Sequence, residues 1–302
     1  MTDSPIVFDR KTVRLHRDRA AEHLDANDFL RHEIAERLLD RLDDVKRAFP
    51  LALDLGCATG TLSRMLGGRG GIETLVQCDL SPRMAKAAGR RAVAGDEEAL
   101  PFAENSFDLI LSCLSLHWVN DLPGALVQIR RALKPDGLFL GALFGGGTCR
   151  ELRQSLAEAE IAVEGGMSPR VSPMAEVRDA GNLLHRAGFA LPVADADLIT
   201  VSYGEPLKLM ADLRAMGETN AVHERRKAPT KRDTLAAAVQ RYRDLFGGED
   251  GRVPASFEVV FLTAWAPHPS QQKPARPGSA TARLADALGS EEIPSGDRAR
   301  PR

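Results

Sequence analysis

The first place where chemistry is expected is a carboxylate that precedes a glycine turn. The segment LALDLGCATG runs from an apolar stretch into Asp54, and Gly56, Cys57, Ala58 and Gly60 follow. Glycines at such a turn allow positive φ and close backbone approach, and the next helix offers free N–H groups to a ligand. A dinucleotide site would need GxGxxG, and its pyrophosphate would be repelled by the acid. An acid ahead of the glycines therefore favours a nucleotide-like ligand that carries positive charge.

Further acids follow the next two predicted strands. Asp79 ends the stretch ETLVQCDL, where a carboxylate can bind both hydroxyls of a ribose, and Asp96 follows a short third strand, where it can bind the adenine amine. These positions favour S-adenosylmethionine, which combines adenine and ribose with a sulfonium and an ammonium group. The predicted cofactor-binding residues are Asp54, Gly56, Cys57, Ala58, Gly60, Asp79, Leu80, Asp96, Glu97, Ser112 and Leu114.

The elements that must position these residues alternate between strand and helix. Apolar stretches at 51–56, 73–80, 106–119 and 138–144 predict strands, with helices between them and amphipathic helices before residue 50. This alternation predicts an α/β fold with a parallel sheet and helices on both faces. The predicted divisions are an N-terminal helical lid at 1–50, a cofactor-binding half at 51–145, a second half with a substrate cap at 146–266 and a disordered tail at 267–302.

The bulk composition excludes several classes of protein. The 302 residues carry a net charge of -2 with 27% charged residues, so electrostatic attachment to nucleic acid or membrane is not expected. No apolar stretch is long enough to span a bilayer, and the N-terminus lacks the layout of a secretion signal. We therefore expect a cytoplasmic protein, or a mitochondrial matrix protein if the chain is organellar. The four cysteines form no CxxC pair and are expected to be buried free thiols.

The order of these segments resembles a known family. DLGCATG, CDLSPRM, GDEEALPF, FDLILSCLSLHWV and LKPDGLFLGAL are similar to the motifs of class I S-adenosylmethionine-dependent methyltransferases. That resemblance covers about half the chain and implies a Rossmann-like, mostly parallel seven-stranded sheet with a helical cap. It also implies a reversed final strand, SFEVVFLTAW. The family often has glycine at the position of Ala58, and a small residue there still permits close approach.

A narrower resemblance runs almost from end to end. VFDRKTVRLHRDRAA, LSLHWVNDLPGAL, EGGMSPRVSP and LMADLRAMGETNA are similar to the mitochondrial complex I assembly factor 5 family and its bacterial relatives. That resemblance implies hydroxylation of an arginine on a peripheral-arm subunit of complex I. A looser resemblance leads to the malonyl-carrier-protein O-methyltransferases of biotin synthesis. Methyltransferase, arginine hydroxylase and non-enzymatic assembly chaperone all stay open, because a fold does not settle a function.

The residues that would meet an acceptor are harder to identify. Methyl transfer depends on alignment more than on acid–base help, so few catalytic residues need be visible. The candidates are His117 and Trp118, which lie at the carboxyl edge of the fourth strand and which packing explains equally well, and Tyr203, for which a structural role is favoured. Insertions before the last strand often cover the acceptor pocket in this fold. That region here contains Met216, Glu218, Asn220 and His223, and an earlier turn, Met167–Arg170, could close over the same cleft.

Basic residues crowd the N-terminal helix. Arg10, Lys11, Arg14, Arg17 and Arg19 could form a solvated face, clamp the cofactor carboxylate from a lid, or dock an acidic partner.

Hydroxylation would also need a metal or an organic cofactor to activate oxygen. His16 and Asp18 have a suitable spacing for ligands, but side chains two residues apart on a helix point away from each other. No metal site is predicted.

Overall fold

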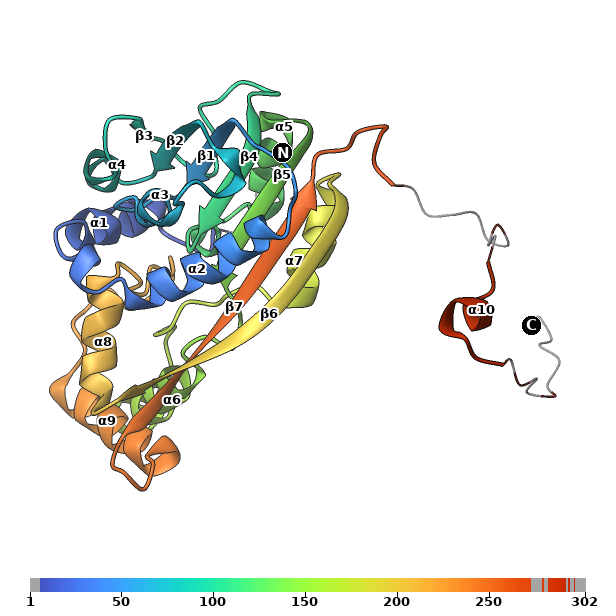
Figure 1. Cartoon of the computed structure of the whole chain (residues 1–302). Helices are drawn as coiled ribbons and strands as arrows, with labels where there is room; N and C mark the ends of the chain where they lie inside the picture. The colour runs from blue at the N-terminus through green and yellow to red at the C-terminus, as the bar shows by residue number, and fades with distance from the viewer. Residues whose placement is uncertain (1–5, 273–278, 280–281, 292, 294–295, 297–302) are drawn as a thin grey trace. The chain divides into compact units, whose positions relative to one another are not determined.

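A computed structural model describes residues 6–272, 279, 282–291, 293 and 296, and the chain divides at Pro267 into two compact units. The larger unit is built on one seven-stranded sheet with the strand order β3-β2-β1-β4-β5-β7-β6 (Figure 1). The strands are β1 (Leu51–Leu55), β2 (Thr74–Asp79), β3 (Ala92–Ala94), β4 (Phe107–Cys113), β5 (Leu133–Phe144), β6 (Ala190–Tyr203) and β7 (Val253–Trp265).

The sheet is parallel except at one strand. β1 pairs in parallel with β2 and β4, and β4 pairs in parallel with β5. β7 runs antiparallel to both of its neighbours, β5 and β6. The predicted Rossmann-like, mostly parallel seven-stranded sheet with a reversed final strand is confirmed. Because the first four strands run the same way, their carboxyl ends, and the residues that follow them, meet at one edge.

Successive side chains of the central strands point into two different apolar layers, one on each face of the sheet. Leu109 and Leu111 of β4 face one layer with helix α2, whereas Ile110 faces the other with α5 and α7. This two-residue period is the signature of a strand buried on both faces. The helices are α1 (Arg10–Ala20), α2 (Phe29–Asp43), α3 (Thr61–Met65), α4 (Pro82–Ala88), α5 (Leu122–Ala132), α6 (Arg150–Glu164), α7 (Val177–Arg186), α8 (Pro206–Ala215) and α9 (Arg232–Phe246), with short 3-10 turns at η1 (Leu24–Ala26), η2 (Arg69–Gly71) and η3 (Leu116–Trp118).

Helices also gather at one end of the long β6–β7 ribbon. This ribbon extends past the other strands, and α6, α8 and α9 pack around its far end (Figure 1). Tyr242 of α9 is fully buried there, and its hydroxyl donates to the carbonyl of Pro254 on β7. The cap expected in the second half of the chain therefore has a clear counterpart, although the predicted division into parts remains a prediction.

One predicted strand is shorter than expected. The strand predicted over 106–119 ends at Cys113, because Leu114 adopts φ 51° and the chain then turns into η3. Leu114 is a non-glycine residue in the left-handed region, and periodicity does not reveal such a break. The helix after the glycine turn covers Thr61–Met65, and Gly67 and Gly68 follow it with φ 55° and 90°. Ser81 caps α4 as predicted, with its Oγ accepting from the N–H of Met84.

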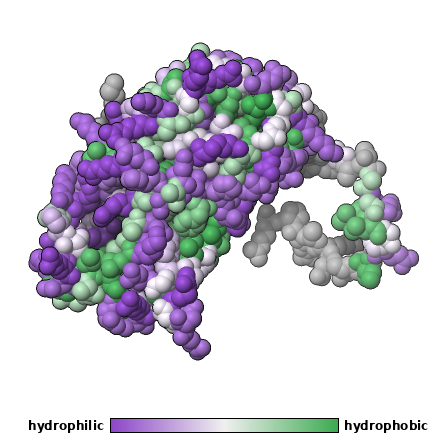
Figure 2. Space-filling view, turned by 60° about the vertical axis from the view of Figure 1, so that its left-hand side comes forward, coloured by the Kyte–Doolittle hydropathy of each residue, from purple (hydrophilic) through white to green (hydrophobic). Residues whose placement is uncertain are grey.

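The second unit begins at His268. It contains one short helix, α10 (Leu284–Leu288), whereas much of the tail predicted to be disordered lies outside the described residues. On the face drawn in Figure 2, hydrophilic residues predominate and hydrophobic ones are scattered in patches between them. Within the described residues, no helix is long and apolar enough to cross a membrane.

Candidate functional site

The turn after β1 is built by residues with left-handed backbone. Gly56, Ala58 and Gly60 have φ of 75°, 48° and 87°. The N–H of Ala58 donates to Oδ2 of Asp79 over 3.0 Å, and the N–H of Ser81 donates to Oδ1 of the same carboxylate over 2.8 Å. Asp79 at the end of β2 thus holds the turn after β1 and the start of α4 together. A side chain at Gly56 would collide with Ser115, so this turn requires glycine for space as well as conformation.

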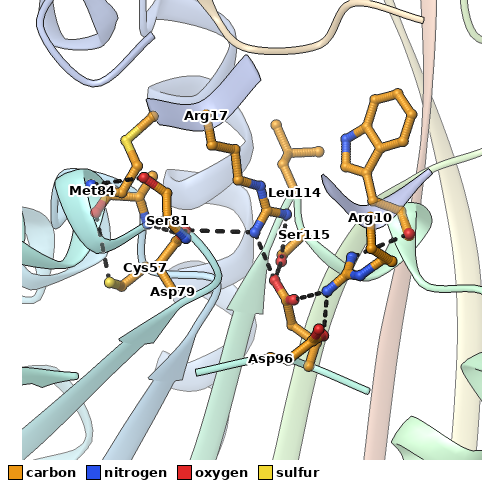
Figure 3. A network of polar contacts seen from close by, with 12 residues as sticks. Arg10, Arg17, Cys57, Asp79, Ser81, Met84, Asp96, Leu114 and Ser115 are labelled. Atoms are coloured by element: carbon orange, nitrogen blue, oxygen red, sulfur yellow. Dashed lines mark hydrogen bonds and ion pairs between the residues drawn. The ribbon is translucent and has the colours of Figure 1, made fainter. Parts of the chain in front are cut away.

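The carboxylate of Glu97 is the centre of a second buried network. Its Oε1 accepts from Nη1 of Arg17 over 2.7 Å and from Oγ of Ser115 over 2.5 Å. Figure 3 labels Arg10, Arg17, Asp96 and Ser115, which belong to this network. Its Oε2 accepts from Nη2 of Arg10 over 2.5 Å, and the same nitrogen also donates to Asp96. Both arginines come from α1, which lies over the strand ends. The arginines that the sequence placed on a lid therefore bind the chain's own carboxylates.

The charges in this network determine its pKa values. Burial raises the pKa of Glu97, but Arg17 and Arg10 outweigh burial and lower it to about 2. Burial raises the pKa of Asp79, and it prevails over the charge of Arg17, whose Nη1 lies 3.6 Å from Oδ1. The pKa of Arg17 rises because its burial is outweighed by the charges of Glu97 and Asp79. Glu97 is thus ionised and matched to a guanidinium, whereas Asp79 is only partly compensated.

Asp54 differs from both of these acids. It is buried at the end of β1, and neither carboxylate oxygen has a hydrogen-bond partner within the described residues. Burial raises its pKa to about 7, against the lowering influence of Arg31 and Gln77, neither of which reaches hydrogen-bond geometry with it. Arg31 instead donates to the carbonyls of Cys113 and Leu114 over 2.6 and 3.1 Å. An unpartnered buried carboxylate is costly, and a bound cation would relieve that cost.

The residues at this edge fit the expected cofactor in kind and position. The orphaned carboxylate of Asp54 and the buried, unpartnered Oγ of Ser112 are polar groups that a ligand could satisfy. The strand ends of β1, β2, β3 and β4 bring together the predicted residues Asp54, Gly56, Cys57, Ala58, Gly60, Asp79, Leu80, Asp96, Glu97, Ser112 and Leu114. Their role as cofactor ligands remains a prediction.

Two of the three catalytic candidates share one partner. Nε2 of His117 lies 3.0 Å from Oε2 of Glu218, and Nε1 of Trp118 donates to that same oxygen over 2.9 Å. Burial would raise the pKa of Glu218, but His117 and the nearby arginines Arg31 and Arg17 keep it below its usual value. Tyr203 is buried at the end of β6, and its hydroxyl has no hydrogen-bond partner among the described residues, so it does not share the contact with Glu218.

A cavity of about 350 Å³ adjoins Glu218, within the volume range typical of small-molecule sites. Half of its lining residues are apolar, with Phe144 from β5 and Leu152 from α6 among them, and the other half are polar or charged, including four arginines. A small void of about 10 Å³ is lined by both Leu114 and Glu218, so the cavity's acid lies close to the strand ends. The cavity is lined by Phe144, Thr148, Cys149, Leu152, Leu156, Pro169, Arg170, Val171, Ser172, Met174, Met210, Leu213, Arg214, Glu218, Thr219, Asn220, Arg225, Arg226, Thr230 and Leu235.

Only part of the predicted acceptor region reaches this cavity. Glu218, Asn220, Pro169 and Arg170 line it, whereas the side chain of His223 is 48% exposed. Sequence reasoning missed Arg31 and Ser115. Arg31 was detectable, because it falls on the apolar stripe of α2 with Ile34, and a cation on a buried stripe needs partners. Ser115 had no signal, since its contact depends on the backbone break at Leu114.

The expectations about cysteine and metal can also be compared with the structure. All four cysteines, Cys57, Cys78, Cys113 and Cys149, are free and buried as predicted, and burial raises the pKa of each thiol. His16 meets the carbonyl of Thr219, and Asp18 accepts from Oγ of Ser81. In the part of the chain that the structure describes, no three His, Cys, Asp or Glu side chains are grouped to hold a metal ion.

Comparison with known proteins gives consistent matches. The family model "Methyltransferase domain" matches residues 53–141. The chain is 47% identical over 287 residues to the mitochondrial arginine-hydroxylase NDUFAF5 of Danio rerio, covering 93% of this chain and 89% of that protein. It is 46% identical to the human NDUFAF5, over 91% of this chain and 81% of that protein.

Two further matches concern another reaction and the fold. The malonyl-[acyl-carrier protein] O-methyltransferase of Xylella fastidiosa is 37% identical, over 86% of this chain and 89% of that protein. The crystal structure of YcgJ from Bacillus subtilis superposes with a TM-score of 0.53 at 16% identity, covering 77% of this chain and 99% of that one. This last likeness concerns the fold alone.

Proposed function

Because the chain belongs to the class I S-adenosylmethionine-dependent methyltransferases, as a relative of the NDUFAF5 arginine hydroxylases, we propose that it modifies an arginine of a complex I subunit during assembly. The proposed modification is hydroxylation. The observation that carries the proposal is the identity of 44–47% to four vertebrate proteins of that name, which extends over more than nine tenths of this chain. The proposed partner is a peripheral-arm subunit, and the proposed compartment is the bacterial cytoplasm or the mitochondrial matrix.

The cofactor of this chain is S-adenosylmethionine, which when bound supplies an activated methyl group. Asp79 would bind the ribose, Asp96 the adenine amine, and Asp54 the positively charged amino-acid portion. Because the guanidinium of Arg17 lies between Asp79 and Glu97, it must share these carboxylates with the ligand or move aside. The turn at Gly56 keeps the backbone free of a Cβ where a ligand would come closest.

The acceptor site supports an arginine substrate. Glu218 places a carboxylate in a cavity that also has an apolar wall, which includes Phe144 and Leu152. A guanidinium pairs well with a carboxylate, and its methylene stem packs on apolar side chains. The same site lies beside the strand ends through the small void shared by Leu114 and Glu218.

Hydroxylation needs a reductant and an oxygen-activating group in addition to the described side chains. One atom of dioxygen would replace a hydrogen of the arginine with a hydroxyl, and the other would leave as water. This needs two electrons and two protons from a reductant, together with a group that activates oxygen. We include an external two-electron reductant and an oxygen-activating group in the proposal, because the described side chains supply neither.

Mass spectrometry of mature complex I tests this function. A strain that lacks the gene should lose the mass of one oxygen atom from an arginine of a peripheral-arm subunit, and the intact gene should restore it. An oxygen that persists on that arginine in the deletion strain would contradict the proposal. Normal assembly of complex I with an Asp79→Ala variant that no longer binds cofactor would instead indicate a non-enzymatic chaperone.

A carboxylate acceptor is the second candidate. Arg214 lines the cavity, is exposed, and has no carboxylate partner among the described side chains, so it could bind an anionic group such as a carrier-linked acid. The relative from Xylella fastidiosa supports this reading through its name. Purified chain incubated with labelled cofactor and malonyl-carrier protein would then transfer label to the carrier. Unlabelled carrier, with cofactor bound, would eliminate this candidate.

A further inference from the structure

Glu218 is held in one orientation by two donors on the same short turn. His117 and Trp118 of η3 meet Oε2, at 3.0 and 2.9 Å. The side chain of His117 is fully buried and that of Glu218 is 9% exposed. An ionised carboxylate only accepts hydrogen bonds, so Nε2 of His117 is the donor of its pair. Two donors on one oxygen fix the plane of the carboxylate and leave little rotational freedom.

The other oxygen of this carboxylate is available. Oε1 of Glu218 has no hydrogen-bond partner in the described part of the chain, and Glu218 lines both the large cavity and the small void beside Leu114. Because the lowered pKa of Glu218 keeps it ionised near neutral pH, this oxygen carries negative charge. A fixed, partly desolvated acceptor that faces a cavity favours a cationic donor.

Three of the four arginines that line the cavity, Arg170, Arg225 and Arg226, are paired with acids. Arg170 pairs with Glu160 over 2.6 Å, and Arg226 pairs with Glu164. Arg225 donates to Thr12 over 2.8 Å and lies 3.4 Å from Asp9. Each of these three arginines therefore has an acid partner. Arg214 has no carboxylate partner among the described side chains, but it is exposed, so solvent and salt screen its charge. Among the described residues that line the cavity, Glu218 is the one carboxylate, and it lies next to the apolar wall that includes Phe144.

We propose that Glu218, positioned by His117 and Trp118, is the specificity-determining residue that receives the guanidinium of an arginine side chain in this cavity. The inference deepens the proposed function, on which its biological meaning rests. Oε1 of Glu218 accepts from the guanidinium, and the methylene stem lies along the apolar wall. His117 and Trp118 act as positioning residues. The reacting part of the arginine is thereby brought to the side of the cavity next to Leu114, where the strand ends meet.

The indole N–H of Trp118 gives a direct readout, because it donates to the same carboxylate. The chain has two tryptophans, so a ¹⁵N-labelled full chain gives two indole signals, and Trp265→Phe assigns them. Titration with n-butylguanidinium should shift the Trp118 signal saturably and leave that of Trp265 unmoved. The neutral isostere n-butylurea should cause no saturable shift. Equal shifts with both compounds would overturn the proposal.

Two variants separate recognition from general damage. Glu218→Gln keeps the shape of the side chain and should weaken n-butylguanidinium binding by about tenfold or more. Glu224→Gln makes the same charge change at a neighbouring side chain that is 84% exposed, and it should bind as the natural protein does. If Glu218→Gln binds equally well, the proposal is wrong. Loss of binding in both variants would also contradict it, since the effect would then follow net charge.

The same variants distinguish this inference from the function it deepens. A natural chain that binds n-butylguanidinium through Glu218, with no oxygen on any subunit arginine, would leave the recognition site standing and remove hydroxylation. Normal arginine hydroxylation in a strain that carries Glu218→Gln would support the function and contradict the recognition site. In that case the function would stand, and Glu218 would have no part in substrate recognition.

Discussion

Nη1 of Arg17 lies 2.7 Å from Oε1 of Glu97 and 3.6 Å from Oδ1 of Asp79, so one buried guanidinium joins acids that follow two different strands. The arginine comes from α1, while the acids come from the ends of β2 and β3. The N-terminal helix is thus fastened to the sheet edge by charge as well as by apolar packing.

Arg17→Ala should destabilise the chain strongly. It leaves two buried acids with less compensation, and breaking a buried ion pair on one side costs about 3–5 kcal/mol. Urea denaturation at pH 7 measures the loss. Arg14→Ala, on the same helix with a side chain 54% exposed, should change the free energy of unfolding by less than about 1 kcal/mol. Similar losses in the two variants would show that the buried network contributes little.

Asp54 should make the chain less stable as pH rises. Its pKa is raised from 3.8 to about 7 in the folded state. Between these values the unfolded chain has lost the proton that the folded chain retains, so stability falls with pH and levels off above 7. Asp54→Asn removes this slope. Relative to the natural protein, the variant should gain about 2–3 kcal/mol between pH 5 and pH 8 in urea denaturation.

The exposed acid Asp44 provides the control for that series. Asp44→Asn should follow the natural protein at every pH. A constant difference between Asp54→Asn and the natural protein from pH 5 to 8 would mean that Asp54 stays ionised throughout this range.

Gly56→Ala and Gly68→Ala should separate backbone strain from collision. Both glycines have positive φ, 75° and 90°, so each alanine costs about 1–2 kcal/mol. A side chain at Gly56 also meets Ser115, whereas nothing lies within 4 Å at Gly68. Gly56→Ala should therefore lose about 1–3 kcal/mol more in thermal unfolding, and it should also lose S-adenosylmethionine binding in equilibrium dialysis. Equal effects at both positions would count against the close approach at Gly56.

Much of the sheet edge was predictable because it follows from strand order alone. Parallel strands end at one edge, so Asp54, Asp79 and Asp96 had to converge once their strands were recognised. The partners of these acids were not predictable. Charge patterning shows that α1 is basic, but only the packing of Val13 against Trp118 determines that Arg17 faces inward. Hydrophobic periodicity likewise continued the strand through Leu114, where the backbone turns.

The contacts around His117 and Trp118 were even less predictable from the sequence. His117 and Trp118 were predicted as candidates from their place after the fourth strand, yet the residue that unites them, Glu218, lies about a hundred positions away. Tyr203 was grouped with them by its place in the chain alone, and its hydroxyl has no hydrogen-bond partner among the described residues. Contacts between segments this distant depend on how η3 and the loop after α8 pack together, which one sequence does not encode locally.

Helix α1 contacts both the strand ends and the cavity beside Glu218. Its Arg17 holds the acids at the strand ends, and Asp9 at its start holds Arg225, which lines the acceptor cavity. His16, on the same helix, contacts Thr219 of that cavity. A ligand that binds Asp79 therefore competes with Arg17 for this carboxylate. Other residues of the same helix contact the lining of the cavity. Binding at the strand ends is therefore expected to change the affinity of the cavity for its own ligand, and binding in the cavity should change cofactor affinity by the same factor.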